Sequence, residues 1–570
     1  MQQSRLETIY LMEKKLTDIN PIKLFENKKL SAKMKISDDE YSYPEISLEY
    51  GKPPQIQLRA DIKDKDISVE SINDNYFDTY FISDIHRHNI FLPAIFKYLF
   101  IGKADKDKLN KVYFTIPELS SYFNIELNYN LDNDSNLSGN LKIPQLEAKV
   151  ESLGLSIRVH QGYNFKENED HTGFSFKNII YFSYESDAYL SFQDIENLMY
   201  KTIGLLTWVT GYPVSIESVE VSDGEKDGYL YISSVKKLKK YDTSHPKSFM
   251  HVKALRVYFN QICNNYFDKK EIFENIWSRT LPLFDFTGVL EYEVMLYTSI
   301  LDRYFSYQYE KIKPVQNKNY SSHILKIENF FKTNNEFKNL LEGIDLIDTI
   351  QAKKLFPKIK NPTFIDKKDA YFQHIGEDNL KIFISDEDFK KIKYIRDKTA
   401  HGNKVELDTD DVLKYLWKVK ILTMYFIYID LGIKEDDFFV FISNTLHPIP
   451  LNCEMDEYLL NLKIGKTILM NLDQVEREKT ENSVTNVKVF NKKNDHYIFN
   501  LKLSQQAHEY FLENKSTEYN PTRFYSYEKY VQHLIDQEDI NLKAKYYSKA
   551  YLNGESSEET IDNAIILNSI

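Results

Sequence analysis

The spacing of hydrophobic positions divides the chain into a first part of short strands and a middle part of longer helices. In the first 240 residues, short apolar segments alternate with turn-forming clusters such as Gly51-Lys52-Pro53-Pro54, a pattern typical of β-structure. The segments predict strands near 30 to 36, 45 to 50, 54 to 60, 77 to 84, 112 to 117, 154 to 160 and 174 to 184, and a hairpin of 214 to 222 and 229 to 234.

Two other features belong to this first part. The stretch from 128 to 140 is rich in Asn, Asp and Ser, which predicts a surface loop. A helix should start after Ser191 and end at Gly211, because a serine N-cap and a glycine C-cap bracket a run with helical periodicity. The apolar face of that helix is Ile195, Leu198, Thr202, Leu205 and Val209.

A second helix is predicted over 386 to 400. Ser385 reads as its N-cap, the acidic residues that follow complement the positive end of the helix dipole, and Gly402 stands where a left-handed C-cap is expected. One face is apolar at three- and four-residue steps: Phe389, Ile392, Ile395 and Thr399. Arg396 projects from the border of this face, and His401 leaves from the last turn.

These patterns predict an α+β multidomain protein. A β-rich N-terminal domain, which can comprise two subdomains, spans 1 to 240, and a helical linker spans 241 to 284. An all-α helical bundle follows over 285 to 435, with long helices through 289 to 305 and from about 410 to 431. Residues 436 to 570 read as a mixed α/β extension, with strands near 456 to 464, 486 to 490 and 496 to 503, a polar loop at 476 to 485, and helices near 505 to 514 and 525 to 537.

The charge distribution is uneven along the chain. The whole sequence carries a net charge of −12, which argues against general affinity for nucleic acid. Residues 390 to 404 are the opposite, with six basic residues and one acid: Lys390, Lys391, Lys393, Arg396, Lys398 and Lys404 against Asp397. A lysine run is commonly a solvated helix face, but this one coincides with a motif that suits a phosphate-binding site.

Neither export nor membrane insertion is indicated. The two cysteines, Cys263 and Cys453, lie far apart in sequence and fit a reducing cytoplasm. The N-terminus lacks an apolar signal core, and charged residues interrupt the most hydrophobic run, 412 to 433. We therefore expect a cytoplasmic protein that does not associate with membranes.

The segment Arg396-Asp397-Lys398-Thr399-Ala400-His401 is an R-x4-H motif, and Arg396 is the only one of ten arginines with histidine at that spacing. RNA can be cut by its own 2′-hydroxyl if a base takes the hydroxyl proton and positive charge stabilises the phosphoryl oxygens. His401 suits the first role, Arg396 suits the second, and Asp397 could orient either. This chemistry needs no metal or cofactor. The alternative is a catalytically idle pair that is merely stabilised at the negative end of the helix dipole.

A competing constellation lies in the β-rich part. Asp84, His86 and His88 would share one face of a strand and could bind a divalent metal. No nearby Cys or H-E-x-x-H motif completes a site, so three polar residues on a strand face are the simpler interpretation.

The motif Arg396-Asp397-x3-His401 resembles the R-[NDH]-x3-H signature of HEPN ribonuclease domains, over about residues 285 to 435. Asp302 falls at a position that is often polar or acidic on the first helix of such domains and could face Arg396, with Glu291 and Glu293 as competitors. The order of the parts is similar to the Apea-like subgroup, in which a β-rich domain precedes the HEPN domain and whose members are associated with antiphage abortive infection in bacteria.

The resemblance implies a metal-independent endoribonuclease acting on cellular RNA such as tRNA. It implies Arg396 and His401 as catalytic residues supported by Asp397 and Asp302, and a homodimer formed through the HEPN domain. The basic residues Lys393, Lys398 and Lys404 would bind RNA, and a phage-derived protein could act as trigger at the N-terminal domain. A catalytically silent module that binds RNA or protein is the alternative.

Overall fold

The computed structural model describes residues 24, 27–37, 40–42, 45–49, 55–56, 66–71, 78–82, 94–95, 98–123, 129–131, 137–139, 146–167, 174–232, 241–244, 246–312, 362–376, 378–494, 496–514, 524, 526–538, 540–552 and 560–569. The chain divides into two compact units, which are described separately. The first unit comprises Met1–Tyr371, Lys390–Lys434 and Asn444–Asn452, and the second comprises Phe372–Phe389, Glu435–Ser443 and Cys453–Ile570. The predicted α+β class is confirmed, while the domain boundaries at 240, 284 and 435 remain predictions.

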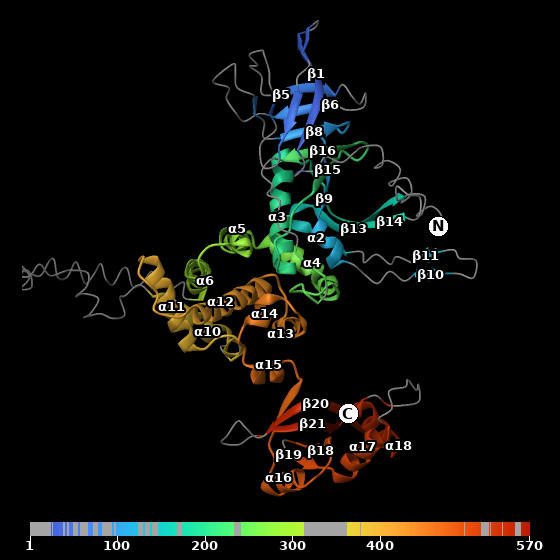
Figure 1. Cartoon of the computed structure of the whole chain (residues 1–570), viewed down its shortest axis with the longest axis vertical. Helices are drawn as coiled ribbons and strands as arrows, with labels where there is room; N and C mark the ends of the chain where they lie inside the picture. Colours follow the sequence, from blue (N-terminus) through green and yellow to red (C-terminus); the bar gives the residue numbers. More distant parts are fainter. Residues whose placement is uncertain are drawn as a thin grey trace, which may run out of the picture. The chain divides into compact units, whose positions relative to one another are not determined.

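One large sheet dominates the first unit (Figure 1). Its strand order is β12-β13-β14-β9-β15-β16-β8-β6-β5-β1-β3-β4-β7, with β2 beside β1, and every pairing along this path is antiparallel. The strands are β1 (Lys28–Ser37), β2 (Glu40–Ser42), β3 (Glu45–Leu48), β4 (Gln55–Ile56), β5 (Asp66–Ser71), β6 (Asp78–Ile82), β7 (Ala94–Ile95), β8 (Tyr98–Gly102), β9 (Lys111–Thr115), β12 (Leu146–Val150), β13 (Leu155–Glu167), β14 (Phe174–Ser186), β15 (Ser218–Ser222) and β16 (Asp227–Ile232).

The predicted strands and the predicted hairpin all overlap strands of this sheet, but β2, β5, β7, β8 and β12 were not predicted. β8 is a continuous apolar run buried at every position, so it lacks the alternation that marks a strand with one solvated face. The predicted loop at 128 to 140 is wrong in part, since it contains the two-stranded ribbon of β10 (Tyr129–Leu131) and β11 (Leu137–Gly139).

The long helices α3 and α4 pack against this sheet. α3 (Phe192–Thr210) begins with a capping box between Ser191 and Asp194 and ends at Gly211 with φ +78°, as predicted. The Tyr184 hydroxyl on β14 lies 2.7 Å from Thr202 Oγ1 on α3. α4 (Val252–Asp268) places Phe259 against Phe182 of the same strand.

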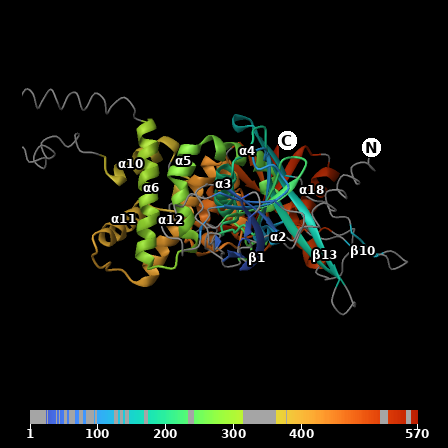
Figure 2. The same ribbon diagram turned by 90° about the horizontal axis from the view of Figure 1, so that it is seen from above.

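The remaining helices of the first unit surround a core of aromatic rings. α6 packs along α12 (Figure 2), and Tyr304 of α6 lies between Trp277 and Phe426, with ring centres 4.5 and 5.0 Å away. α12 matches the helix predicted from about 410 to 431. The other described helical segments of the first unit are α2 (Pro117–Tyr122), η1 (Glu151–Leu153), α5 (Lys270–Asn275), η2 (Trp277–Asp285), α6 (Leu290–Ile312), α10 (Phe364–Ile375), α11 (Asp386–Ala400), α12 (Thr409–Asp430) and α14 (Pro448–Asn452). The end of α10 and the start of α11 belong to the second unit, as do η4 (Leu380–Ile382) and α13 (Glu435–Asn444).

The second unit contains a mixed five-stranded sheet of order β17-β20-β21-β18-β19. β17 pairs in parallel with β20 and β18 in parallel with β21, whereas β20–β21 and β18–β19 are antiparallel. Its elements are α15 (Glu457–Lys463), β17 (Thr467–Met470), α16 (Gln474–Glu481), β18 (Lys488–Lys493), β19 (His496–Phe499), α17 (Leu501–Glu513), α18 (Tyr527–Gln537), β20 (Leu542–Leu552) and β21 (Thr560–Ser569).

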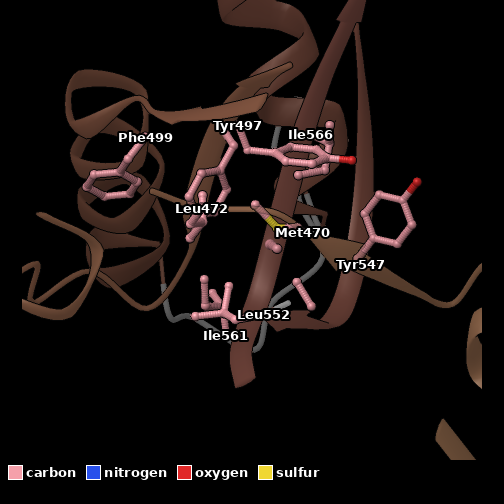
Figure 3. Close-up of a cluster of buried hydrophobic side chains, with 11 residues drawn as sticks. Met470, Leu472, Tyr497, Phe499, Tyr547, Leu552, Ile561 and Ile566 are labelled. Carbon is pink, nitrogen blue, oxygen red and sulfur yellow. The ribbon is translucent and has the colours of Figure 1, made fainter. Parts of the chain in front are cut away.

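Alternation along the strands separates two hydrophobic clusters on the two faces of this sheet. One cluster includes Met470, Tyr497, Tyr547 and Ile566 (Figure 3). The other holds residues of α17 and α18 against Val489, Ile565 and Leu567. The two helices therefore cover one face only.

Two predictions for this region are wrong. The strand predicted at 456 to 464 is α15, and the predicted polar loop at 476 to 485 begins inside α16. In both helices an aspartate N-cap, Asp456 or Asp473, accepts a hydrogen bond from the backbone N–H three residues on. Helices of seven and eight residues are too short for a clear hydrophobic period, so the caps were their main signal.

Candidate functional site

The R-x4-H motif lies at the C-terminal end of α11, whose observed bounds match the predicted helix. Ser385 and Asp388 form a capping box in which each side chain accepts the other's backbone N–H, at 3.1 and 2.8 Å. Phe389, Ile392 and Ile395 are buried. This packing fixes the helix and therefore the direction in which Arg396 leaves it.

The other end of α11 is closed by a Schellman motif. Gly402 has φ +67°, its N–H donates to the Thr399 carbonyl at 3.0 Å, and the Asn403 N–H donates to the Lys398 carbonyl at 2.9 Å. Because Gly402 turns the chain away from the helix, His401 is the last residue that remains on the helical path.

Arg396 is held by contacts from two other helices. Its Nη2 donates to Asp302 Oδ2 on α6 at 2.7 Å, and its guanidinium carbon lies 5.6 Å from the ring centre of Phe364 on α10. The side chain is 25% exposed and that of Asp302 is 22% exposed. The guanidinium is therefore oriented and partly desolvated while part of it stays open to a ligand.

Asp302 joins Arg396 to a second cation. Its other carboxylate oxygen lies 3.4 Å from Lys367 Nζ, which also donates to Ser306 Oγ at 2.8 Å. Asp302 is therefore shared between α10 and α11. Of the three carboxylates considered from the sequence, it is the one against Arg396, since Glu293 pairs with Lys420 at 2.7 Å.

Asp397 lies on the other side of the guanidinium. Its Oδ1 is 3.7 Å from Arg396 Nη1 and its Oδ2 bonds to Lys393 Nζ one turn earlier. The network thus holds three cations, Arg396, Lys367 and Lys393, with two carboxylates, Asp302 and Asp397. It carries a net charge of +1, which suits an anionic ligand.

His401 lies outside this network. Its imidazole is exposed, and none of the described residues makes a hydrogen bond or ion pair with it. Its backbone N–H donates to the Asp397 carbonyl at 3.2 Å, which continues the helical hydrogen bonding by one residue. The ring is therefore accessible to a substrate from solvent.

The predicted RNA-binding lysines occupy different settings. Lys393 is committed to Asp397, and Lys398 Nζ lies 5.6 Å from the centre of the Tyr394 ring. Lys404, like Lys390 and Lys391, is exposed. Tyr394 also ties the following turn to the helix, because its hydroxyl accepts the Glu406 N–H at 3.3 Å.

Sequence reasoning missed Lys367, Phe364 and Ser306. A local signal existed for α10, because Thr363 and Asp366 form another capping box, with bonds of 2.7 and 3.3 Å. That signal predicts a helix from 364 with Lys367 one turn after Phe364. Which carboxylate Lys367 meets depends on tertiary packing.

A metal site receives no support from the described part of the chain. Asp84, His86 and His88 lie outside the described residues, and within those residues no three His, Cys, Asp or Glu side chains are grouped so as to hold an ion. Cys263 and Cys453 are both buried thiols. None of the helices that the structure describes is long and apolar enough to cross a membrane.

Part of the chain matches a known protein family. Residues 79–279, about a third of the chain, match the family model of the ApeA N-terminal domain 1. This range includes the strands from β8 to β16 with α3 and α4, and it supports an ApeA-like family for this part of the molecule. The R-x4-H segment lies outside the matched range. No curated protein and no solved structure matches the chain.

Proposed function

We propose that this protein is a metal-independent endoribonuclease of the HEPN type. The observation that carries the proposal is the guanidinium of Arg396, held by Asp302 and Asp397 at the end of a helix that also presents the exposed His401. A fixed cation and an accessible imidazole on one helix end are the minimum set for phosphodiester cleavage by the neighbouring hydroxyl.

In the proposed reaction the 2′-oxygen of RNA attacks the adjacent phosphorus. His401 takes the proton from the 2′-hydroxyl, and Arg396 stabilises the charge on the phosphoryl oxygens. The bond from phosphorus to the 5′-oxygen breaks, and a proton returns to that oxygen. The products are a 2′,3′-cyclic phosphate and a 5′-hydroxyl. Asp302 and Asp397 act through Arg396 and are positioning residues. Exposed Lys404 and the ammonium of Lys398 would steer the RNA backbone.

The test is RNA cleavage by the purified chain in EDTA, followed by analysis of product ends. We expect cleavage to persist in EDTA and to leave 2′,3′-cyclic ends. His401→Ala should lower the rate by about two to four orders of magnitude. Arg396→Lys should also inactivate the protein, because an ammonium does not reproduce the planar fork of arginine.

Matched controls lie on neighbouring helices. His374 is an exposed histidine in the last turn of α10, ahead of Gly376 with φ +87°, so His374→Ala repeats the change in a similar setting. Arg303 is exposed on α6 beside Asp302, so Arg303→Lys controls for the arginine. Both variants should cut at the wild-type rate. Normal cutting by His401→Ala would overturn the assignment.

A catalytically silent module that binds RNA or protein is the second candidate. It is favoured by the lack of an orienting partner for the His401 imidazole among the described residues, since a catalytic histidine is commonly held by a third group. RNA binding without cleavage in either EDTA or manganese would support this candidate. Cleavage that appears only with manganese would instead point to a metal-dependent site.

The ApeA N-terminal domain match suggests a biological setting. We propose that the nuclease acts in antiphage abortive infection on cellular RNA such as tRNA, and that residues 1 to 240 respond to a phage-derived protein. In bacteria carrying the wild type, cyclic RNA ends should accumulate only after infection, and His401→Ala should abolish them. Equal accumulation before infection would remove the trigger from the proposal.

We also propose a homodimer through the helical region, in which two R-x4-H motifs face one cleft. Partly exposed apolar side chains on α12, among them Leu413 and Trp417, and exposed Tyr292 on α6 support this proposal. Sedimentation equilibrium of the purified chain should give twice the monomer mass. A monomer with full activity would exclude the shared cleft.

A further inference from the structure

The second unit contains a cavity that the proposed nuclease chemistry does not use. Its volume is about 360 Å³, which falls in the range of pockets that bind small molecules. It lies where β18 and β21 end, between the first turn of α17 and the last turn of α18. β18 and β21 are parallel, with Asn491 opposite Leu567, so their carboxyl ends meet at this edge. Crevices at the carboxyl ends of parallel strands are favoured ligand sites in α/β sheets.

The cavity has an apolar floor and a polar rim. Side chains from the helix-covered face of the sheet build the floor: Leu503, Ile535 and Leu567 belong to the cluster under α17 and α18, and Leu542 packs against it. Alternation from Val489 and Ile565 puts Asn491, Lys493 and Ser569 on this same face, at the strand ends. Asn500 lies at the start of α17, where its side chain accepts the Leu503 N–H at 3.1 Å.

Positive charge gathers at the rim. Lys493 and Lys502 line the cavity with Glu538 as the single acid. Lys492 also borders it, but alternation puts its side chain on the other face of the sheet, where its ammonium lies 5.7 Å from the centre of the Tyr497 ring. Lys502 pairs with Glu538 at 2.9 Å, but both side chains are well exposed, and such surface pairs are weak. The N-terminus of α17, a helix of 13 residues, adds unpaired backbone N–H groups and the positive end of its dipole.

We infer that this cavity binds a nucleoside phosphate, with the phosphate between Lys493, Lys502 and the start of α17 and the base over the apolar floor. The rim and the helix end supply charge for a phosphate group. The floor supplies apolar area for a flat ring, and the amides of Asn491 and Asn500 supply donors and acceptors for its polar edge. Phosphate alone would leave the floor unused, and an uncharged nucleoside would leave the lysines unused.

The test is isothermal titration of the full-length chain with AMP, GMP, CMP and UMP, with adenosine and inorganic phosphate as separate arms. At least one nucleotide should bind with one site per chain. Adenosine alone and inorganic phosphate alone should each bind about tenfold more weakly or worse. Lys493→Ala and Lys502→Ala should each weaken that nucleotide by about tenfold.

Lys529→Ala is the matched control, because Lys529 is an exposed lysine on α18 that does not line the cavity. Arg396→Lys separates this cavity from the proposed nuclease site, and nucleotide binding should survive that substitution. Lack of binding by all four nucleotides would overturn the inference, as would binding that Lys493→Ala and Lys502→Ala leave intact. Equal affinity for inorganic phosphate would overturn the nucleoside part.

Discussion

Asp302 is the residue through which the candidate site depends on a distant part of the chain. It is 94 positions from Arg396 yet accepts its hydrogen bond at 2.7 Å, and it also meets Lys367. A carboxylate that accepts from two cations restricts where each can point, because ionic hydrogen bonds are short and directional. Loss of that carboxylate should therefore disturb the guanidinium more than the fold.

Asp302→Asn tests this role. The amide keeps the shape but loses the charge, so we expect the rate of RNA cleavage to fall about tenfold or more, with a smaller loss of binding, since orientation matters most in the transition state. Cleavage kinetics with separate kcat and KM measure the effect. Glu291→Gln changes another α6 carboxylate in the same way and should leave kcat unchanged. If the two variants behave alike, Asp302 has no positioning role.

Glu220 makes a separate prediction about pH. It lies on β15 between Tyr113 of β9 and Tyr229 of β16, and burial, with Asp227 nearby, raises its pKa from 4.5 to about 7. The folded chain therefore retains a proton that the unfolded chain releases above about pH 4.5. Stability should fall as the pH rises from about 4.5 to 7 and then level off.

Glu220→Gln should remove this loss and stabilise the protein at pH 8 by up to about 3 kcal/mol relative to the wild type. Urea unfolding at pH 5 and pH 8 measures it, with Glu225→Gln in the exposed hairpin turn as control. Burial also raises the pKa of Asp430, to about 6, so Asp430 contributes to the pH dependence of wild-type stability. The quantity to compare is therefore the difference in unfolding free energy between Glu220→Gln and the wild type at each pH. An equal gain at both pH values would contradict the assignment.

At the scale of elements, local signals account for what could be predicted. The sequence predicts α11 from Ser385, the helical spacing of its apolar residues and Gly402, because both caps and the buried face are encoded by consecutive residues. The same reasoning missed α15, α16 and β8, whose signals are a single cap or an apolar run without alternation. For Arg396, the sequence offered three α6 carboxylates as partners: Asp302, Glu291 and Glu293. Local patterns do not choose among them, because the choice depends on how the helices pack in three dimensions.

The C-terminal cap of α11 gives a prediction at this scale. An added Cβ on Gly402 would meet nothing within 4 Å, so a substitution there costs backbone energy alone. Gly402→Ala should destabilise the protein by about 1 kcal/mol because alanine disfavours positive φ. Gly402→Asn should cost less, since asparagine tolerates this region. Thermal unfolding of the three proteins measures the order, and equal stability of alanine and glycine would refute the cap's contribution.

At the scale of the whole molecule, the first unit joins its sheet to its helices through α3. Trp208 is fully buried and its indole N–H donates to Thr280 of η2 at 2.9 Å. The Tyr428 hydroxyl of α12 lies 3.1 Å from the Trp208 carbonyl, and His447 Nε2 lies 3.0 Å from the Gly211 carbonyl. Side chains from before and after residue 240 therefore share one core.

A chain beginning at residue 241 should consequently fail to fold its helices. It would lose Trp208 and the rest of α3 and leave apolar surface on α4, η2 and α12 exposed. Each large buried side chain that is lost costs about 3 to 5 kcal/mol. Several such losses exceed the total free energy of unfolding of a typical domain, which is about 5 to 15 kcal/mol. Circular dichroism should show less helix than residues 241–570 contribute to the full chain, and urea unfolding should lack the cooperative transition of the first-unit helices. In the full chain, Trp208→Phe should lower the stability of sheet and helices together, by about 1 kcal/mol for the lost hydrogen bond. A well-folded, helical 241–570 chain would instead mean that the β-rich region is separable, and the proposed nuclease activity could then be tested without it.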